Sequence, residues 1–189
     1  MTTGTGSPSG GPVLVRRAVA DDAAELARVA AITFPLACPP STTEQAKADF
    51  IATRLSEHAF AGYLSAPDHI VLIAEARGPG APAVGYTMLI TGEPADADVR
   101  AAVTARPTVE LSKVYVLPEH HGGGAAAALM DASAVAARET GAVSLWLGVN
   151  DENARANRFY EKHGFRIVGV KKFRLGEVDE DDFVRERAL

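Results

Sequence analysis

The chain has 189 residues, and its 19 lysines and arginines against 24 aspartates and glutamates give a formal charge of −5. Hydrophobic residues make up 47% and charged residues 23%, the balance of a globular domain that buries a full core and needs no disulfide or metal cross-links. This acidic balance argues against a nucleic-acid-binding protein, because neutralising phosphates requires a basic excess. The single cysteine, Cys38, excludes an internal disulfide and fits a reducing cytoplasm, where we expect the protein.

The first twelve residues, MTTGTGSPSGGP, predict a disordered tail that precedes a single domain over 13–189. This segment lacks the charged and apolar regions of a signal peptide. No apolar run approaches the roughly 20 residues that a membrane-spanning helix requires. We therefore expect no membrane partner.

Up to residue 60 the pattern predicts one strand and two helices. Val13–Val15 is the strand, and apolar residues spaced three to four apart after Asp21 and Asp22 predict a helix that reaches Ile32. The prolines within 34–40 cannot all lie in one helix, so we expect a break there. The second helix is capped by Ser41 or Thr42, and its apolar side carries Phe50, Ile51 and Leu55.

The rest of the chain is a run of strands followed by alternating strands and helices. Strands are predicted over 70–76, 84–90, 109–117, 142–149, 165–175 and 182–189, and helices over 125–140 and 153–163. The first two strands form an antiparallel pair, and a polar, acidic loop over 92–98 follows them. This order is typical of an α/β (α+β) domain with a mixed, mostly antiparallel sheet, of about 6–7 strands flanked by about four helices.

A glycine-rich loop, HGGGAA over 121–126, lies between a predicted strand and an alanine-rich helix. Glycines let the backbone approach an anion, and the free N–H groups of the first helical turn point at it, so the pattern predicts a pyrophosphate site. A plain flexible turn is equally compatible with it. The spacing Gly122-x-Gly124-x-x-Ala127 also fits a loose dinucleotide fingerprint, but the next strand closes at Asn150 without the expected acid. A nicotinamide-dinucleotide protein stays as an alternative.

A second group of residues follows on the last predicted helix. Asn153, Ala156 or Asn157, and Tyr160 fall on one helical stripe. The tyrosine can be a core residue whose hydroxyl is satisfied at the surface. Beside a pyrophosphate loop it can instead donate a proton to a thiolate leaving group, since a phenol has a pKa of about 10.

Together the two segments resemble the GNAT superfamily of N-acetyltransferases, which use acetyl-CoA. The coenzyme loop of that family, Gln/Arg-x-x-Gly-x-Gly/Ala, is matched by 121–126, with His121 in place of the usual Gln or Arg. The later segment is matched by Asn153, Ala156, Tyr160 and Gly164-Phe165. Within the superfamily the C-terminal half is most similar to the bacterial spermidine/spermine N-acetyltransferases. It is less similar to the ribosomal-protein alanine acetyltransferases, which carry a glutamate base where this chain has Gly148.

The resemblance implies a GNAT fold, acetyl-CoA as cosubstrate, and a primary amine as acceptor, with a polyamine such as spermidine or spermine as the favoured example. It implies Tyr160 as the catalytic acid and Glu110 as the base, although a solvated strand-end carboxylate also explains Glu110. A backbone N–H near Val116 would polarise the thioester oxygen. The residues it assigns to acetyl-CoA are Val114, Tyr115, Val116, His121, Gly122, Gly123, Gly124, Ala125, Ala126, Asn153 and Tyr160.

Other charged residues receive no firm role. Lys113 and Tyr115 alternate to the face opposite Ser112 and Val114, so we assign Lys113 no catalytic role. Acids in two predicted loops can attract a polycation or simply favour solubility: Glu93, Asp96 and Asp98, then Glu177 and 179–182. The histidines lack metal-ligand spacing, so we expect no metal.

Two further interpretations of function remain open. One is a non-catalytic sensor that binds acyl-CoA, and the other is an acetyltransferase for a protein N-terminus, a lysine or an aminoglycoside-like amine. The expected partners are acetyl-CoA and a small amine, with no nucleic acid, and the protein is expected to be a monomer or homodimer.

Overall fold

A computed structural model describes residues 13–76, 81–176 and 178–189, and the predicted tail over 1–12 lies outside them. In chain order the elements are β1 (Val13–Arg17), η1 (Ala20–Asp22), α1 (Ala23–Ala37), α2 (Glu44–Arg54), α3 (Glu57–Ser65), β2 (His69–Ala76), β3 (Ala83–Thr91), α4 (Ala97–Ala102), β4 (Thr108–Val116), η2 (Pro118–His120), α5 (Ala125–Glu139), β5 (Ser144–Asn150), α6 (Ala154–Lys162), β6 (Arg166–Leu175) and β7 (Val178–Ala188). The expected mixture of strands and helices is confirmed.

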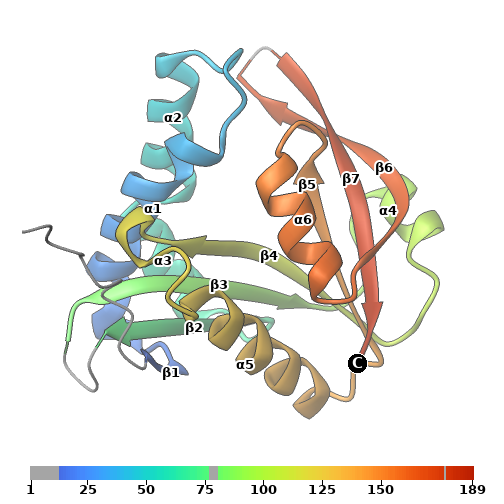
Figure 1. Ribbon diagram of the computed structural model, residues 1–189, viewed down its shortest axis with the longest axis horizontal. Coiled ribbons are helices and arrows are strands. Elements are labelled where there is room, and N and C mark those ends of the chain that lie inside the picture. Colours follow the sequence, from blue (N-terminus) through green and yellow to red (C-terminus); the bar gives the residue numbers. More distant parts are fainter. Residues whose placement is uncertain (1–12, 77–80, 177) are drawn as a thin grey trace, which may run out of the picture.

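The seven strands form one sheet in the order β1-β2-β3-β4-β5-β7-β6. Every neighbouring pair is antiparallel except β4 and β5, which confirms the predicted mostly antiparallel sheet. β4 and β5 pair at only three positions, where Thr108, Val109 and Glu110 face Ser144, Leu145 and Trp146. Beyond these positions the two strands diverge (Figure 1), so the sheet opens at its centre.

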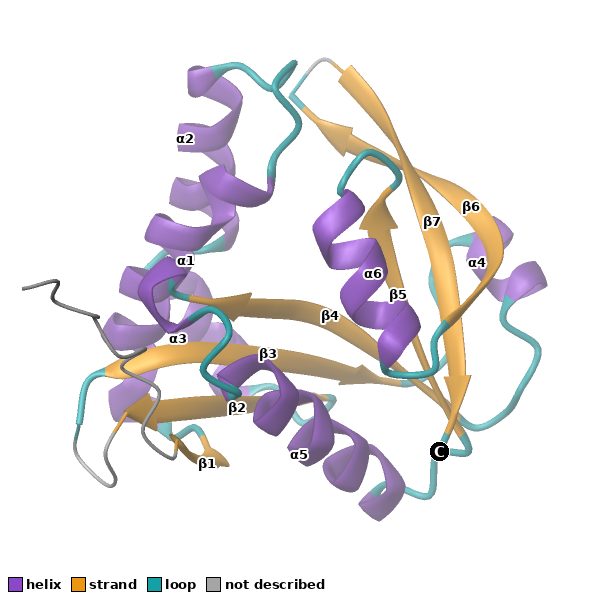
Figure 2. Ribbon diagram, viewed as in Figure 1, coloured by secondary structure: helices purple, strands orange, loops and turns teal. Residues whose placement is uncertain are grey.

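Helices cover both faces of the sheet (Figure 2). One apolar cluster joins α5 and part of α6 to one face, and a second joins α1 and α3 to the other. Successive residues of β2 alternate between the clusters: Ile70 and Leu72 pack toward α5, whereas Val71 and Ile73 pack toward α1. Burial on both faces explains why β2 reads as an almost continuous apolar run. In the described part of the chain, no helix combines the length and apolar character needed to span a membrane.

The end of the first helix differs from the prediction. α1 continues through Pro35 to Ala37, and the chain becomes extended only at Cys38, before the prolines at 39 and 40. A single proline removes one intrahelical hydrogen bond, which the buried contacts of Phe34 in the α1–α3 cluster outweigh. The cap of α2 is Thr43, whose hydroxyl accepts from the backbone N–H of Ala46, so the predicted caps Ser41 and Thr42 are wrong by one or two residues.

The described residues contain six α-helices, whereas the sequence predicted about four, because its pattern did not indicate α3 and α4. Both are short: Ser56 caps the nine residues of α3, and Asp96 caps the six residues of α4. α4 begins within the last two residues of the segment interpreted as an acidic loop, 92–98, and extends beyond it. Its one buried residue, Val99, gives too little periodicity to predict a helix.

The last strand also begins earlier than predicted, at Val178 instead of Asp182. Its acidic residues face basic residues of β6 across the hairpin: Lys171 pairs with Asp182, Lys172 with Asp181, and Arg174 with Asp179. Opposite charges at facing positions stabilise an antiparallel pair. The acidic run after Val178 is therefore strand, and Glu177 lies outside the described residues.

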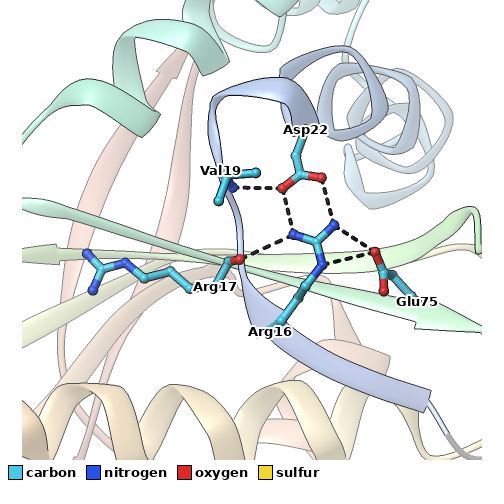
Figure 3. A network of polar contacts seen from close by, with 5 residues as sticks. All are labelled: Arg16, Arg17, Val19, Asp22 and Glu75. Atoms are coloured by element: carbon cyan, nitrogen blue, oxygen red, sulfur yellow. Dashed lines mark hydrogen bonds and ion pairs between the residues drawn. The ribbon is translucent and has the colours of Figure 1, made fainter. Parts of the chain in front are cut away.

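Arg16 on β1 holds two carboxylates together (Figure 3). Its guanidinium donates to both oxygens of Asp22, at 2.7 and 2.8 Å, and twice to Oε1 of Glu75, at 2.6 and 3.0 Å. The sequence predicts that Asp21 or Asp22 caps α1. Asp22 does occupy the N-cap position, but its side chain does not cap the helix, because its Oδ2 accepts from the backbone N–H of Val19. Hydrogen bonds from Arg16 lower the pKa of Asp22 and so favour its charged form. The two ion pairs of Arg16 link β1 to β2 and to the start of α1.

Candidate active site

The divergence of β4 from β5 opens two adjoining cavities. The first, of about 210 Å³, is lined by His121 and Ala126 of the glycine-rich segment, and we call it the loop cavity. The second, of about 250 Å³, contains five charged side chains, and we call it the charged cavity. The residues that line both are Ala37, Val114, Tyr115, Asn153, Ala156 and Tyr160. A ligand spanning both cavities would therefore pass between β4 and the start of α6.

The glycine loop reaches the loop cavity at its two ends, through His121 and Ala126, whereas the predicted coenzyme residues Gly122, Gly123, Gly124 and Ala125 do not line it. Gly122 and Gly124 have positive φ values of 80° and 86°, a conformation that favours glycine. Gly124 is the N-cap of α5, and the first turn of this helix has neither a side-chain cap nor an acidic residue. Its N–H groups are therefore available to a bound anion, and the positive end of a 15-residue helix favours one.

The imidazole of His121 holds the loop against the end of β4. Its Nε2 lies 2.8 Å from the backbone carbonyl oxygen of Val116, a hydrogen bond that requires a proton on that nitrogen. The histidine at this position therefore anchors the loop, a role that does not require its side chain to contact the ligand.

α6 places Tyr160 where the two cavities meet. The helix starts at Asn153, whose Oδ1 accepts from the backbone N–H of Ala156 at 3.0 Å, which leaves the amide nitrogen as the part of Asn153 free to donate. The ring of Tyr160 packs edge-on against Phe165 at 5.8 Å between centroids. Burial raises the pKa of Tyr160, so the phenol is protonated at neutral pH.

A bulge in β4 changes which residues share a face. Met88 of β3 pairs with Lys113 and Leu89 pairs with Leu111, so Ser112 is the extra residue between them. One extra residue reverses the alternation of side chains beyond it. Glu110 and Lys113 consequently both line the charged cavity. The predicted alternation holds beyond the bulge, since Val114 packs in the α5 cluster and Tyr115 in the α1–α3 cluster, but it does not reveal that Lys113 shares a cavity with Glu110.

Burial dominates the electrostatics of the charged cavity. It raises the pKa of Glu110, against the opposing effect of Lys171 and Lys113. It lowers the pKa of Lys113 to about 8, and it raises the pKa of Asp182 to about 6. Charge in this cavity is therefore costly unless an opposite charge compensates it.

Gly148 on β5 makes room for the side chain of Lys171 from β6. A Cβ atom at Gly148 would lie 2.5 Å from Cε of Lys171, 3.1 Å from its Nζ, and 3.2 Å from Oδ2 of Asp182. The lysine stem therefore crosses directly over the glycine. A glycine within a strand often marks a position where another chain segment approaches closely. Lys171 was not identified from the sequence, and Gly148 is the one feature of the sequence that pointed to a neighbour there.

The acids proposed to attract a polycation separate into two groups. Glu93 pairs with Arg106 at 2.7 Å and Asp96 caps α4, and neither lines a cavity. Glu180 and Asp182 do line the charged cavity. Among the described residues, no cluster of three or more histidines, cysteines or acids is arranged to hold a metal ion.

The remaining wall of the charged cavity is apolar. Phe34 stacks on Phe50 with ring centroids 4.5 Å apart, and Phe50 meets Phe173 edge-on at 6.0 Å. Cys38 also lines this wall, where its thiol donates to the carbonyl oxygen of Phe34 and burial raises its pKa to about 11. The thiol is therefore protonated at neutral pH and is a poor nucleophile.

Comparison with known proteins gives a consistent result. The model of the acetyltransferase (GNAT) family matches residues 36–165. An uncharacterized N-acetyltransferase of Mycobacterium tuberculosis is 48% identical over 168 residues, which cover 89% of this chain and 98% of that protein. The streptothricin acetyltransferase of Streptomyces lavendulae is 39% identical over 70 residues, 37% of this chain and 36% of that protein. The PaiA N-acetyltransferase of Thermoplasma acidophilum, solved with coenzyme A, has the same fold, with a TM-score of 0.73 at 19% identity over 95% of this chain and 100% of that one.

Proposed function

The chain belongs to the GNAT family of acetyltransferases, and from that premise we propose that it transfers the acetyl group of acetyl-CoA to a small primary amine bound in the charged cavity. The activity itself, acetyl-CoA-dependent N-acetyltransfer, follows from the family. The observation that carries the proposal is the position of Tyr160, which lines the loop cavity and the charged cavity at once. A group at this boundary can reach both the acyl donor and the acceptor.

The loop cavity suits coenzyme A. The free N–H groups at the start of α5 would hold its diphosphate, with Gly122, Gly123, Gly124 and Ala125 forming the turn. Seven of the residues that the sequence assigned to acetyl-CoA line this cavity: Val114, Tyr115, Val116, His121, Ala126, Asn153 and Tyr160. β4 has no strand partner beside Val114–Val116 on the β5 side. Apart from the carbonyl of Val116, which accepts from His121, its backbone groups there can bind the pantetheine arm and the thioester.

Glu110 is the proposed base and Tyr160 the proposed acid. A primary amine with a pKa of about 10 is almost fully protonated at neutral pH and must lose a proton to attack the thioester carbon. Glu110, in the charged cavity, would accept that proton directly or through a water molecule. The phenol of Tyr160 would donate to the sulfur as the carbon–sulfur bond breaks.

The sequence favours a polyamine as the acceptor, and part of the charged cavity supports a cationic one. Glu110, Glu180 and Asp182 supply carboxylates there. The aromatic wall of Phe34, Phe50 and Phe173 would pack against the methylene groups of such an amine. Spermidine and spermine therefore belong among the acceptors to test.

The function is tested by the release of coenzyme A thiol from acetyl-CoA across a panel of primary amines. The panel includes polyamines, amino acids, an aminoglycoside and a peptide with a free N-terminus. We expect release with at least one small amine and acetylation at its primary nitrogen by mass spectrometry. Binding of coenzyme A without release across the panel would favour the acyl-CoA sensor, and binding of a reduced nicotinamide cofactor instead would favour the dinucleotide alternative.

Replacing Glu110 with glutamine should shift the pH dependence of kcat/KM toward higher pH. Without the base, only amine that is already neutral can react, and this fraction rises about tenfold for each pH unit below its pKa. We expect a loss of roughly 10-fold to 100-fold at pH 7 that narrows by pH 9.5. Glu119→Gln, an exposed carboxylate just beyond β4, is the matched control and should follow the wild-type profile. An unchanged profile for the Glu110 variant would assign proton removal to another group.

A further inference from the structure

We propose that the acceptor carries a negatively charged group in addition to its amine, and that Lys171 and Lys113 bind this group. The inference rests on the proposed function and narrows the substrate class of the same site. It starts from the two ammonium groups in the cavity that would receive the acceptor.

Among the described residues, neither lysine forms a direct ion pair with a carboxylate, although Lys171 faces Asp182 across the β6–β7 hairpin and lysines nearby do form such pairs. Lys172, the next residue on β6, forms an ion pair with Asp181 at 2.6 Å, and Lys47 on α2 pairs with Glu44 at 2.8 Å. Lys113 is close instead to the ring of Tyr63, with its Nζ 5.4 Å from the ring centroid. Two ammonium groups in one cavity without a direct partner leave room for an anionic ligand.

The backbone fixes the position of Lys171. Its stem lies over Gly148, and its Nζ is 5.9 Å from the ring centroid of Phe173. The same ammonium opposes the rise in the pKa of both Glu110 and Asp182, and all three side chains line the charged cavity. A ligand anion beside Lys171 would therefore leave the amine of the same ligand near Glu110.

The balance of charge disfavours an acceptor that is cationic throughout. Three carboxylates and two lysines give the cavity a formal charge of −1, so most of the positive charges of a fully protonated polyamine would lie uncompensated beside Lys113 and Lys171. An amine that also bears a carboxylate or phosphonate would compensate the lysines and the acids together. The wall of Phe34, Phe50 and Phe173 would contact the carbon chain between the two charges.

The test uses amines of one chain length that differ only at the far end. 4-Aminobutanoate, butylamine and 1,4-diaminobutane end in a carboxylate, a methyl group and an ammonium group. Alanine and 2-aminopropane form a second pair, in which the carboxylate lies next to the amine. In at least one set, we expect kcat/KM for the carboxylate-bearing amine to exceed that of its partners about tenfold or more.

Variants assign the effect to the lysines. Lys171→Met and Lys113→Met should each lower the ratio of kcat/KM for the carboxylate-bearing amine to kcat/KM for its methyl-ended partner about 10-fold or more, because any effect on the pKa of Glu110 acts on both amines and cancels in this ratio. Lys171→Arg should restore part of the loss, because it restores the charge. Lys172→Met is the matched control on the same strand and should behave as wild type, since Lys172 lines neither cavity. Unchanged coenzyme A affinity and circular dichroism confirm that each variant is folded.

The outcomes separate the two proposals. Preference for the diamine or the methyl-ended amine, or an equal loss for all amines in Lys171→Met and in Lys113→Met, would overturn the negatively charged acceptor and leave the proposed transferase intact. Absence of thiol release with every amine, despite coenzyme A binding, would overturn the proposed function itself.

Discussion

Tyr160→Phe is expected to lower kcat about 100-fold or more while changing the dissociation constant of acetyl-CoA less than about threefold. The substitution removes one hydroxyl and keeps the ring that packs against Phe165. Coenzyme affinity should therefore survive, because packing along the loop cavity is preserved. Steady-state thiol release gives kcat, and calorimetry gives the dissociation constant.

The size of this effect follows from the environment of the phenol. Burial raises the pKa of Tyr160, which keeps the donor proton in place at neutral pH. The same shift makes the phenol a weaker acid than a typical thiol, whose pKa is about 8.5. A hydrogen bond donated to the sulfur as negative charge develops on it would therefore supply much of the effect, and such bonds are strongest in sites that exclude water.

Two other tyrosines provide the comparison. Tyr63→Phe removes a hydroxyl that donates to the carbonyl of Arg54 outside both cavities, and it should leave kcat within about twofold. Tyr115 lines both cavities, and its pKa is also raised by burial. If Tyr115→Phe loses turnover and Tyr160→Phe keeps it, the donor is Tyr115. Equal losses of turnover and coenzyme affinity in Tyr160→Phe would make the hydroxyl a binding group.

The sequence predicted the long elements of the fold well and the short ones poorly. The strand, loop and helix from β4 through α5 have a strong apolar periodicity, and Gly141 follows the end of the helix. The strand, the loop and the helix are all confirmed. α4 was not predicted, because a helix of six residues with one buried valine shows almost no apolar periodicity. α1 passes Pro35 because tertiary packing outweighs one lost hydrogen bond, which local rules do not include.

For the candidate site, local motifs led to the loop and to Tyr160, but the charged cavity required the three-dimensional structure. Glu110 and Lys113 share a face only because of the bulge at Ser112, which has no distinctive local sequence. Lys171 and Asp182 reach the site from the β6–β7 hairpin, and Gly148 alone hinted that another chain segment lies close there. Long-range register, not residue type, thus determines which charges meet.

Arg16→Met should lower the free energy of unfolding by about 2–3 kcal/mol at pH 7. The substitution leaves the carboxylate of Glu75, whose side chain is 3% exposed, without the guanidinium that donates to it at 2.6 and 3.0 Å. Breaking a fully buried pair costs about 3–5 kcal/mol, and we expect less because the side chain of Arg16 is 35% exposed. Urea unfolding with a common m-value measures the difference.

Lowering the pH should reduce the difference in the free energy of unfolding between wild type and Arg16→Met. The pKa of Asp22 is lowered in the folded protein by its hydrogen bonds to Arg16, so its contribution is complete above its unfolded pKa of about 3.9. That contribution disappears as the pH falls through the lower, folded value. The difference in stability between wild type and the Arg16 variant should therefore narrow below about pH 4, by the share that Asp22 contributes.

Two further variants separate the ion pair from general effects on β1. Arg17→Met removes the neighbouring exposed arginine, keeps the carbonyl that accepts from Arg16, and should change stability by less than about 0.5 kcal/mol. Adding Glu75→Gln to Arg16→Met removes the unpaired charge and should recover part of the loss, since an uncompensated buried carboxylate is its main cause. A single Arg16 variant as stable as wild type at pH 7 would show that water replaces the guanidinium at Glu75, and β1 would then be held by its strand pairing with β2 and by the packing of Val13 and Val15 against the α5 cluster.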